Sequence, residues 1–271
     1  MAKRALCIGI NDYPGTQSDL YGCVNDARDW AALLTQRDFT VQTLFDKKAT
    51  AQQLRTSIAA LALKAKKGDR IVIQYSGHGS FVPDQDGDEA DGNDECLCPY
   101  DIGTSGPITD DELHEIFSQA QKGVRILMIS DSCHSGTITR FAPITTPPTT
   151  KQKHAPQRTV RFLPPATYLS RTEVSHLKPC PTLTRTRPRK TPAALLLSGC
   201  QDHEYSYDAY FLGRPNGAFT YVALRTLSQL PPEATYADWY KEIRKALPSR
   251  QYPQTPNLHG STAMKRWKVL G

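Results

Sequence analysis

The sequence predicts an α/β fold with a mostly parallel central β-sheet flanked by helices on both faces. Short apolar runs alternate with segments of helical periodicity, which is the order of strands and helices in such a fold. Residues 4–10 form an apolar run of the kind found in strands covered on both faces. A chain of 271 residues with 39% hydrophobic and 22% charged content can also bury a sizeable core.

The first half of the chain predicts three strands separated by two helices. After the strand at residues 4–10, apolar residues from 24 to 34 recur at helical spacing. Residues 39–45 predict the second strand. Thr50, with Gln53 three residues later, begins a helix that extends to about residue 66. Gly68 and Asp69 end this helix, and residues 70–75 predict the third strand.

The rest of the chain continues the alternation. Residues 83–107 predict a long acidic loop, after which Thr109 caps a helix over residues 110–121. Residues 124–129 predict the fourth strand. Residues 193–198 predict a further strand, residues 217–228 and 236–247 predict helices, and residues 265–270 predict a final strand.

The net charge of +6 is unevenly distributed. Residues 140–190 hold eleven Lys or Arg residues and one acid, Glu173, so this segment carries +10 and the remainder carries −4. The segment is rich in proline and lacks glycine, which is typical of a loop or partly disordered linker. We expect one domain over residues 1–271. It would comprise a large catalytic region at about 1–140, a linker at 141–190 and a small C-terminal region at 191–271.

The cysteines and the N-terminal residues indicate in which compartment the protein is expected. Seven cysteines are scattered without the spacing of a disulfide framework, which indicates a reducing compartment such as the cytoplasm. No apolar run approaches the roughly 20 residues that a membrane-spanning helix needs. The N-terminus leads directly into a strand, so no secretory signal is expected.

Two predicted strand ends carry reactive side chains. The third strand runs into Tyr75-Ser-Gly-His-Gly-Ser80, and the fourth into Asp131-Ser-Cys-His-Ser-Gly136. Because the carboxyl ends of neighbouring parallel strands meet at one edge, His78 and Cys133 would face each other there. A nearby histidine favours the thiolate form that makes a cysteine nucleophilic. The backbone N–H groups of Gly79 and Cys133 would then form an oxyanion hole.

Each of these residues alone has a simpler interpretation. A cysteine at a strand end is often a small buried hydrophobe, and a histidine between glycines can be a turn residue. Together, 55 residues apart, they match the spacing of a caspase-type histidine and cysteine. His134 is a rival base, but adjacent residues in an extended segment point to opposite sides.

At this point the chain resembles the caspase-like peptidases, in particular the metacaspase and orthocaspase branch. The resemblance extends from the first strand to about residue 260, apart from residues 139–192. It implies a caspase–hemoglobinase fold. Besides the two segments above, it rests on Gly22-Cys-Val-Asn-Asp-Ala27, Asp86-Gly-Asp-Glu-Ala-Asp-Gly92, Thr109-Asp-Asp-Glu-Leu113 and Leu197-Ser-Gly-Cys-Gln-Asp202.

The resemblance also implies cleavage after Arg or Lys. The residues that line the pocket for this side chain, the S1 pocket, carry over to Cys23, Asp26, Ser76 and Asp131. Two carboxylates can hold a guanidinium through charge-assisted hydrogen bonds. The simpler interpretations are that Asp26 stabilises a helix N-terminus and that Asp131 anchors its own loop.

No obligatory cofactor is expected. The resemblance implies calcium activation through four aspartates, of which Asp94, Asp110 and Asp111 carry over. The fourth position is Arg140, and a cation there should repel Ca²⁺, which prefers clustered oxygen ligands. The acidic loop 84–94 resembles a calcium loop only in composition. Cys96-X-Cys98 lacks the second ligand pair of a structural zinc site.

We therefore expect a monomeric, cytoplasmic cysteine endopeptidase whose protein or peptide substrates carry a basic residue before the cleaved bond. The basic linker suggests self-cleavage between Lys151 and Lys190. The alternatives are a catalytically inactive caspase-like scaffold and a nucleic-acid-binding arm. The second is disfavoured because the linker has only three aromatic residues, Phe141, Phe162 and Tyr168, too few for base stacking.

Overall fold

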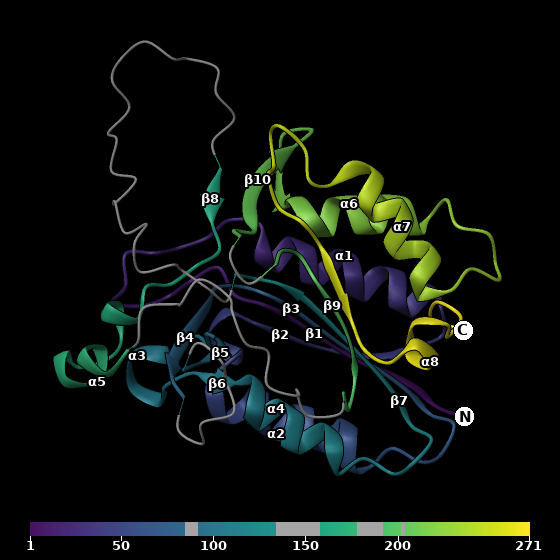
Figure 1. Ribbon diagram of the computed structural model, residues 1–271, viewed down its shortest axis with the longest axis horizontal. Coiled ribbons are helices and arrows are strands. Elements are labelled where there is room, and N and C mark those ends of the chain that lie inside the picture. Colours follow the sequence, from purple (N-terminus) through teal and green to yellow (C-terminus); the bar gives the residue numbers. More distant parts are fainter. Residues whose placement is uncertain (85–91, 134–157, 178–191, 202–203) are drawn as a thin grey trace.

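The computed structural model describes residues 1–84, 92–133, 158–177, 192–201 and 204–271 (Figure 1). Its centre is a six-stranded sheet in the order β12-β9-β7-β3-β1-β2. All neighbouring strands are parallel except β12, which is antiparallel to β9. The predicted α/β class is therefore confirmed. The strands are β1 (Lys3–Gly9), β2 (Thr40–Phe45), β3 (Arg70–Ser76), β7 (Arg125–Asp131), β9 (Leu195–Ser198) and β12 (Asn257–His259).

Helices cover both faces of this sheet because its central strands bury side chains on both sides. On β1, Ala5 and Cys7 belong to one hydrophobic cluster, whereas Leu6 and Ile8 belong to the other. This alternation follows from the two-residue period of a strand. Figure 1 shows α1 (Cys23–Gln36), α6 (Ala218–Leu227) and α7 (Tyr236–Ala246) on one face, and α2 (Ala51–Leu63) and α4 (Asp110–Ser118) on the other.

Two small sheets flank the carboxyl edge of the central sheet. One contains β4 (Gly79–Pro83), β5 (Asn93–Leu97) and β6 (Ile108–Thr109), and the other contains β8 (Thr159–Val160), β10 (Tyr207–Phe211) and β11 (Arg214–Gly217). The remaining short elements are η1 (Asp46–Lys48), α3 (Ile102–Ser105), η3 (Pro165–Thr167), α5 (Arg171–His176) and α8 (Thr262–Lys265).

Two element predictions are wrong. The predicted acidic loop 83–107 contains β5 and α3, because residues 93–97 pair with β4 in an antiparallel ladder. The predicted last strand at 265–270 is absent from the described chain, which has α8 at residues 262–265 instead. The sheet ends with β12, where Leu258 is buried opposite Leu197.

The prediction that the whole basic segment is a loop is also wrong, because residues 158–177 pack onto the molecule. They form β8, η3 and α5, and Leu163 has no exposed surface. Ser170 and Glu173 form a capping box at the start of α5. The rest of the segment, including Lys151 and Lys190, lies outside the described residues.

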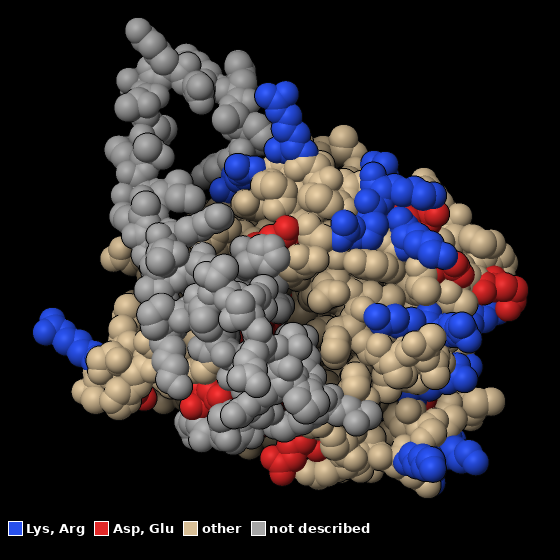
Figure 2. Space-filling model, in the orientation of Figure 1, with Lys and Arg blue, Asp and Glu red and all other residues tan. Residues whose placement is uncertain are grey.

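Basic and acidic side chains are interspersed on the visible surface of the described residues. In Figure 2 the lysines and arginines lie mainly over α6, α7 and α8, with acidic residues among them. On that face, the described residues therefore offer scattered charge rather than one basic groove. No helix in the described part of the chain is long and apolar enough to cross a membrane.

Candidate active site

The register of the central sheet brings the two predicted catalytic side chains to one edge. Ser76 on β3 pairs with Asp131 on β7. His78 and Cys133 each follow this pair by two residues and lie at the carboxyl ends of neighbouring parallel strands. Both are buried, with 1% and 0% of their surface exposed.

The imidazole of His78 is oriented by a backbone carbonyl. Its Nε2 lies 2.6 Å from the Ser18 carbonyl oxygen, which makes Nε2 the protonated nitrogen. Its Nδ1 is buried and has no hydrogen-bond partner among the described residues. The Tyr13 ring packs at 4.6 Å between centroids, and the Tyr13 hydroxyl accepts the His78 backbone N–H at 2.7 Å. These contacts fix the ring with a basic nitrogen available.

The environment of His78 keeps the imidazole neutral. Burial lowers the pKa of His78 from 6.5 to about 4. The contacts with the backbone of Ser18 and of Arg161 oppose this shift, and the nearby Arg161 guanidinium adds to it. A neutral imidazole is the form that can accept a proton from a thiol.

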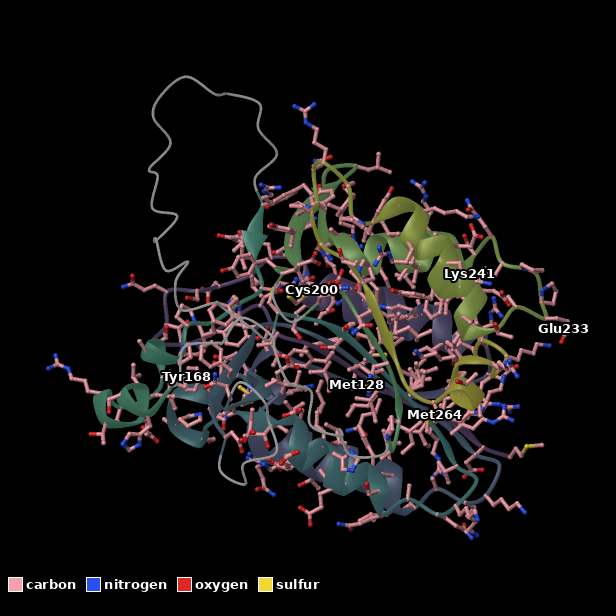
Figure 3. All side chains as sticks on the ribbon, in the orientation of Figure 1. Met128, Tyr168, Cys200, Glu233, Lys241 and Met264 are labelled. Carbon is pink, nitrogen blue, oxygen red and sulfur yellow. The ribbon has the colours of Figure 1, made fainter. Side chains whose placement is uncertain are left out.

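The Cys133 thiol lies against the backbone of Ser206. Its Sγ accepts the Ser206 N–H at 2.6 Å and donates to the Ser206 carbonyl at 3.4 Å. Cys200 lies next to it, donates to the Ser132 carbonyl at 3.4 Å, and has its pKa raised by the Cys133 thiol and by burial. Figure 3 places Cys200 near the centre of the molecule. Among the described residues, no hydrogen bond joins Cys133 to His78.

The predicted S1 pocket contains an arginine of the same chain. The Arg161 side chain is fully buried, and its Nη2 donates to Asp26 at 2.7 Å and to Asp208 at 2.8 Å. Its Nη1 lies 3.2 Å from both a carboxylate oxygen and the carbonyl oxygen of Asp131. A guanidinium with two donor nitrogens is therefore surrounded by three carboxylates, an arrangement that suits its planar fork.

The backbone of Arg161 is held as firmly as its side chain. Its carbonyl oxygen accepts the N–H groups of Gly79 and Cys133, each at 3.1 Å. Its own N–H donates to the Ser206 carbonyl at 3.0 Å, which extends the antiparallel pairing of β8 with β10. The carbonyl group of Arg161 therefore lies where the backbone donors of the two strand ends converge.

The carboxylates of the pocket are fixed by further donors. Asp26 accepts the Gly217 N–H at 2.9 Å and the Asn216 amide at 2.9 Å. Burial raises the pKa of the Asp26 carboxyl to about 7, while Arg161 lowers it. A side chain at position 217 would collide with the Asp131 carboxylate and the guanidinium, so only glycine fits there.

Asp131 is held from both sides. It accepts the Ser206 hydroxyl at 2.5 Å and the Thr220 hydroxyl at 2.7 Å. These donors come from the C-terminal region of the chain, whereas Asp131 ends β7. The pocket therefore forms only when both regions are folded together.

The other two predicted pocket residues are buried beside this cluster. Cys23 begins α1, and its pKa is raised by burial and lowered by the Arg161 guanidinium, which places its thiol near that charge. Ser76 is fully buried next to Asp131 in the sheet, and its hydroxyl accepts from Gln74 at 2.8 Å. No hydrogen bond joins Ser76 to Arg161 among the described residues.

Sequence analysis missed four residues of this site: Ser18, Arg161, Ser206 and Asp208. Asp208 contributes the third carboxylate and also accepts the N–H groups of Tyr21 and Gly22, so it links the pocket to the start of α1. Ser18 acts through its backbone carbonyl, which any residue type provides, whereas Ser206 contributes backbone atoms to Cys133 and its hydroxyl to Asp131. The segment Thr159-Val-Arg-Phe-Leu163 is an apolar run within the basic linker, and that was the available signal for Arg161.

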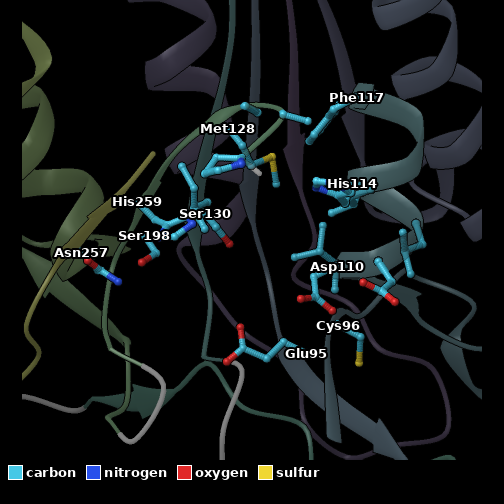
Figure 4. A pocket seen from close by; sticks show the side chains of 18 of the residues that line it. Glu95, Cys96, Asp110, His114, Phe117, Met128, Ser130, Ser198, Asn257 and His259 are labelled. Carbon is cyan, nitrogen blue, oxygen red and sulfur yellow. The ribbon is translucent and has the colours of Figure 1, made fainter. Parts of the chain in front are cut away.

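The predicted calcium ligands lie elsewhere. Asp94 is on β5, while Asp110 and Asp111 begin α4 and line a cavity of about 230 Å³ between α4 and the strands β7 and β9 (Figure 4). Within the described residues, no group of three His, Cys, Asp or Glu side chains is placed to hold a metal ion. Arg140, His134 and part of the acidic loop lie outside them. Calcium binding by Asp94, Asp110 and Asp111 therefore stays a prediction.

A parallel sheet with a cysteine and a histidine at adjacent strand ends is typical of caspase-like cysteine peptidases. Comparisons with known proteins agree. The family model described as "Metacaspase, peptidase C14 domain" matches residues 3–142. The fold is also similar to the crystal structure of protein GSU0716 from Geobacter sulfurreducens, with a TM-score of 0.73 and 30% sequence identity. The match covers 100% of this chain and 98% of that protein's chain.

Similar sequences are named metacaspases. Metacaspase-1 of Cryptococcus neoformans is 33% identical over 97% of this chain and 63% of its own length. Metacaspase-1 of Emericella nidulans is 33% identical over 96% of this chain and 70% of its own length. Metacaspase-7 of Arabidopsis thaliana is 43% identical over 50% of this chain and 35% of its own length. The chain thus spans somewhat less than two thirds of the Cryptococcus protein. The chain belongs to the metacaspase family of caspase-like cysteine peptidases.

Proposed function

We propose that this protein is a cysteine endopeptidase that cleaves after Arg or Lys, and that its own Arg161–Phe162 bond is a substrate. One observation carries the proposal. The Arg161 guanidinium lies between three carboxylates while its carbonyl oxygen accepts the N–H groups of Gly79 and Cys133 at 3.1 Å each. This is the position expected for the residue before the cleaved bond, the P1 residue.

Cys133 and His78 would carry out the chemistry. His78 Nδ1 takes the thiol proton, and Sγ of Cys133 attacks the carbonyl carbon of Arg161. The N–H groups of Gly79 and Cys133 stabilise the negative oxygen, a contribution of about 3 kcal/mol per donor in other enzymes. The C–N bond then breaks, and His78 returns the proton to the nitrogen of Phe162. Water hydrolyses the thioester to an Arg161 carboxylate and the free thiol.

The thiol must turn to begin this reaction. In the structure Sγ is bonded to the Ser206 backbone rather than to His78. A rotation about the Cα–Cβ bond of Cys133 re-aims Sγ without moving the strand. The basic nitrogen of His78 is already available, because Ser18 fixes the proton on Nε2.

A basic P1 residue follows from the charge of the pocket. Asp26, Asp131 and Asp208 are at most 3% exposed, so their charge is poorly screened by water and needs a cation. An acidic P1 side chain would add a fourth negative charge to this cluster. Arginine places two donor nitrogens among the three carboxylates, whereas lysine has one nitrogen. We therefore propose that Arg is preferred over Lys.

Residues 158–177 narrow the expected self-cleavage from the range 151–190 to one bond. The segment enters along β10, passes Cys133 and His78, and continues toward β4. Its direction is that expected of a bound substrate. Because β8 pairs antiparallel with β10 at the edge of the site, successive side chains of the segment are directed into successive pockets of the protein. Cleavage would leave Phe162 as a new N-terminus.

Location and assembly are also proposals. The six described cysteines are free thiols, which supports a reducing compartment such as the cytoplasm. We also propose that the protein is a monomer. No metal takes part in the proposed steps, and calcium activation awaits the chelation experiment described in the Discussion.

The proposal is tested by comparing wild type with Cys133→Ala, using Cys96→Ala as a buried cysteine control. We expect wild type and Cys96→Ala to yield a fragment beginning at Phe162, detected by mass spectrometry, and Cys133→Ala to stay intact. A peptide panel should show cleavage after Arg and Lys but not after Asp. Equal fragmentation of wild type and Cys133→Ala would refute self-cleavage. An inert wild type would favour the scaffold alternative.

A further inference from the structure

A second side-chain site lies on the other side of the Arg161–Phe162 bond. The Phe162 ring stacks on Phe81, with centroids 6.0 Å apart and an angle of 18° between the planes. The Tyr205 ring also lies near it, with centroids 6.4 Å apart and a tilt of 52°. Phe81 belongs to β4 and Tyr205 precedes β10, so the ring is held between the two small sheets that flank the site.

The backbone next to Phe162 is fixed independently of its ring. Gly79 forms a parallel bridge with Phe162: the Gly79 N–H donates to the Arg161 carbonyl at 3.1 Å, and the Leu163 N–H donates to the Gly79 carbonyl at 2.9 Å. The Ser80 hydroxyl donates to the Leu163 carbonyl at 2.7 Å. Any residue at position 162 would therefore have its side chain directed toward Phe81 and Tyr205.

The two rings that line this place, Phe81 and Tyr205, lie outside residues 158–177, whereas Tyr168, which contacts the Phe81 carbonyl, lies within them. Phe81 is only 5% exposed, and its carbonyl accepts the Tyr168 hydroxyl at 3.1 Å. Figure 3 shows Tyr168 on the α5 side of the molecule. A fixed ring can present its face to a second ring, which favours aromatic partners over aliphatic ones of similar size.

We propose that Phe81 and Tyr205 form a specificity site for the residue that follows the cleaved bond, the P1′ residue, and that this site favours aromatic side chains. The inference rests on the proposed function, since it assigns the P1′ position from the Arg161–Phe162 bond. It adds to the basic P1 pocket a second requirement on substrates. Preferred substrates carry Arg followed by Phe or Tyr.

The magnitude follows from the strength of aromatic pairing. A well-oriented pair adds roughly tenfold or less to an equilibrium beyond the effect of burying its area. We expect kcat/KM for a P1′ Phe to exceed that for Leu about threefold and that for Ala about tenfold. Aspartate should be poorer still, because its charge would be desolvated against two rings.

The experiment uses quenched fluorescent peptides with the sequence of residues 158–165, in which position 162 is Phe, Tyr, Leu, Ala or Asp. The wild-type full-length chain, after it has processed itself, is compared with Phe81→Ala, Phe81→Leu and Tyr205→Ala. Leu212→Ala, at a residue that is 98% exposed, is the control. Mass spectrometry confirms the cleaved bond, since Arg158 is also present in the peptide.

The proposal expects the Phe-to-Ala ratio to fall to about twofold in Phe81→Ala and Tyr205→Ala, and to persist in Leu212→Ala. Equal kcat/KM for all five wild-type substrates, with cleavage after Arg, overturns the P1′ site and leaves the proposed function intact. Failure to cleave any peptide after Arg overturns both. The wild-type panel alone decides the question if a variant does not fold.

Discussion

The two sides of the Arg161–Phe162 bond are held by opposite kinds of interaction. Before the bond, three buried carboxylates surround one guanidinium. After it, Phe162 contacts two aromatic rings and Leu163 is buried in the hydrophobic cluster beneath the sheet. The first side depends on charge and should discriminate steeply, since an unpaired buried charge costs several kcal/mol. The second depends on apolar area and should discriminate gradually.

The largest effect is expected from Arg161→Gln. Cleavage of the Arg161–Phe162 bond should fall more than 1000-fold, because about 4 kcal/mol of pocket interaction is lost with the charge. The variant should also be about 3 kcal/mol less stable in urea unfolding at pH 8, since three carboxylates stay buried without a cation. Arg158→Gln, an exposed residue, is the control. Normal cleavage of Arg161→Gln would contradict the charge-based half of the comparison.

The stability deficit of Arg161→Gln should shrink as the pH falls. Arg161 lowers the pKa of Asp26, so its removal leaves the folded pKa above about 7 and far above the unfolded value near 3.8. A carboxyl with a raised folded pKa stabilises the protein below that pKa and loses this contribution as the pH rises through it. Urea unfolding at pH 8 and pH 5.5 should therefore give a larger deficit at pH 8.

The next largest effect is a difference in pH dependence between self-cleavage, in which Arg161 occupies the pocket, and peptide cleavage by the processed enzyme, from which Arg161 has left. Self-cleavage should stay near its maximum down to about pH 5 and decline about tenfold per pH unit below the His78 pKa of about 4. Once residues 158–177 leave, the charge and the backbone contact of Arg161, which act on the His78 pKa in opposite directions, are both lost. His78 also loses part of its burial, the largest cause of its lowered pKa, so its pKa rises. Peptide cleavage by the processed enzyme should then decline at a higher pH.

Rates of both reactions from pH 3 to pH 8 check this prediction. The rate of Cys133 alkylation by iodoacetamide over the same pH range is the control. This neutral reagent does not bind in the carboxylate pocket, so its rate reports the reactivity of the thiol alone. Coincident acid limbs for self-cleavage and peptide cleavage would show that Arg161 has no influence on His78.

A smaller effect on cleavage is expected from Leu163→Ala, which tests the apolar half. The unprocessed protein should lose about 3 kcal/mol of stability, because a fully buried leucine leaves a cavity. Cleavage should slow less than tenfold, since the Arg161 carbonyl keeps its two N–H donors. The measurement is urea unfolding in the Cys133→Ala background, with Leu212→Ala as control. If Leu163→Ala reduced the cleavage rate as much as Arg161→Gln does, the charged side and the apolar side of the Arg161–Phe162 bond would not differ in the way proposed.

The smallest effect is expected from calcium removal. Within the described residues no group of three His, Cys, Asp or Glu side chains is placed to hold a metal ion, so EDTA should change the self-cleavage rate less than twofold. Addition of millimolar Ca²⁺ to chelated protein is the matched measurement. Strong activation would show that Asp94, Asp110 and Asp111 bind the ion together with residues outside the described part.

The sheet and the positions of Cys133 and His78 could be predicted because both depend on local patterns. Alternating apolar runs indicate strands, and parallel strands share one carboxyl edge. Asp26 and Asp131 were assigned to the pocket through the resemblance to metacaspases, and they lie together as expected.

The remaining parts of the site depend on contacts between distant segments. Arg161 meets Asp26 across 135 residues and Asp208 across 47, and no periodic pattern connects them. Among the ten basic residues of the linker, composition alone could not single out one. Ser18 and Ser206 contribute backbone atoms, which leave no trace in a sequence, and the Ser206 hydroxyl reaches Asp131 from 75 residues away. The short strands β5 and β12 were missed for a related reason, because their pairing partners rather than their own residues define them.

The covalent connection of Arg161 to the rest of the chain has a kinetic consequence. A group held on the same molecule as its binding site competes at an effective concentration on the order of millimolar, whatever the dilution of the protein. Processing of one chain should therefore be first order and insensitive to protein concentration. A free peptide offered at micromolar concentration would meet an occupied pocket, so an uncleaved preparation should look inert until its own bond is cut.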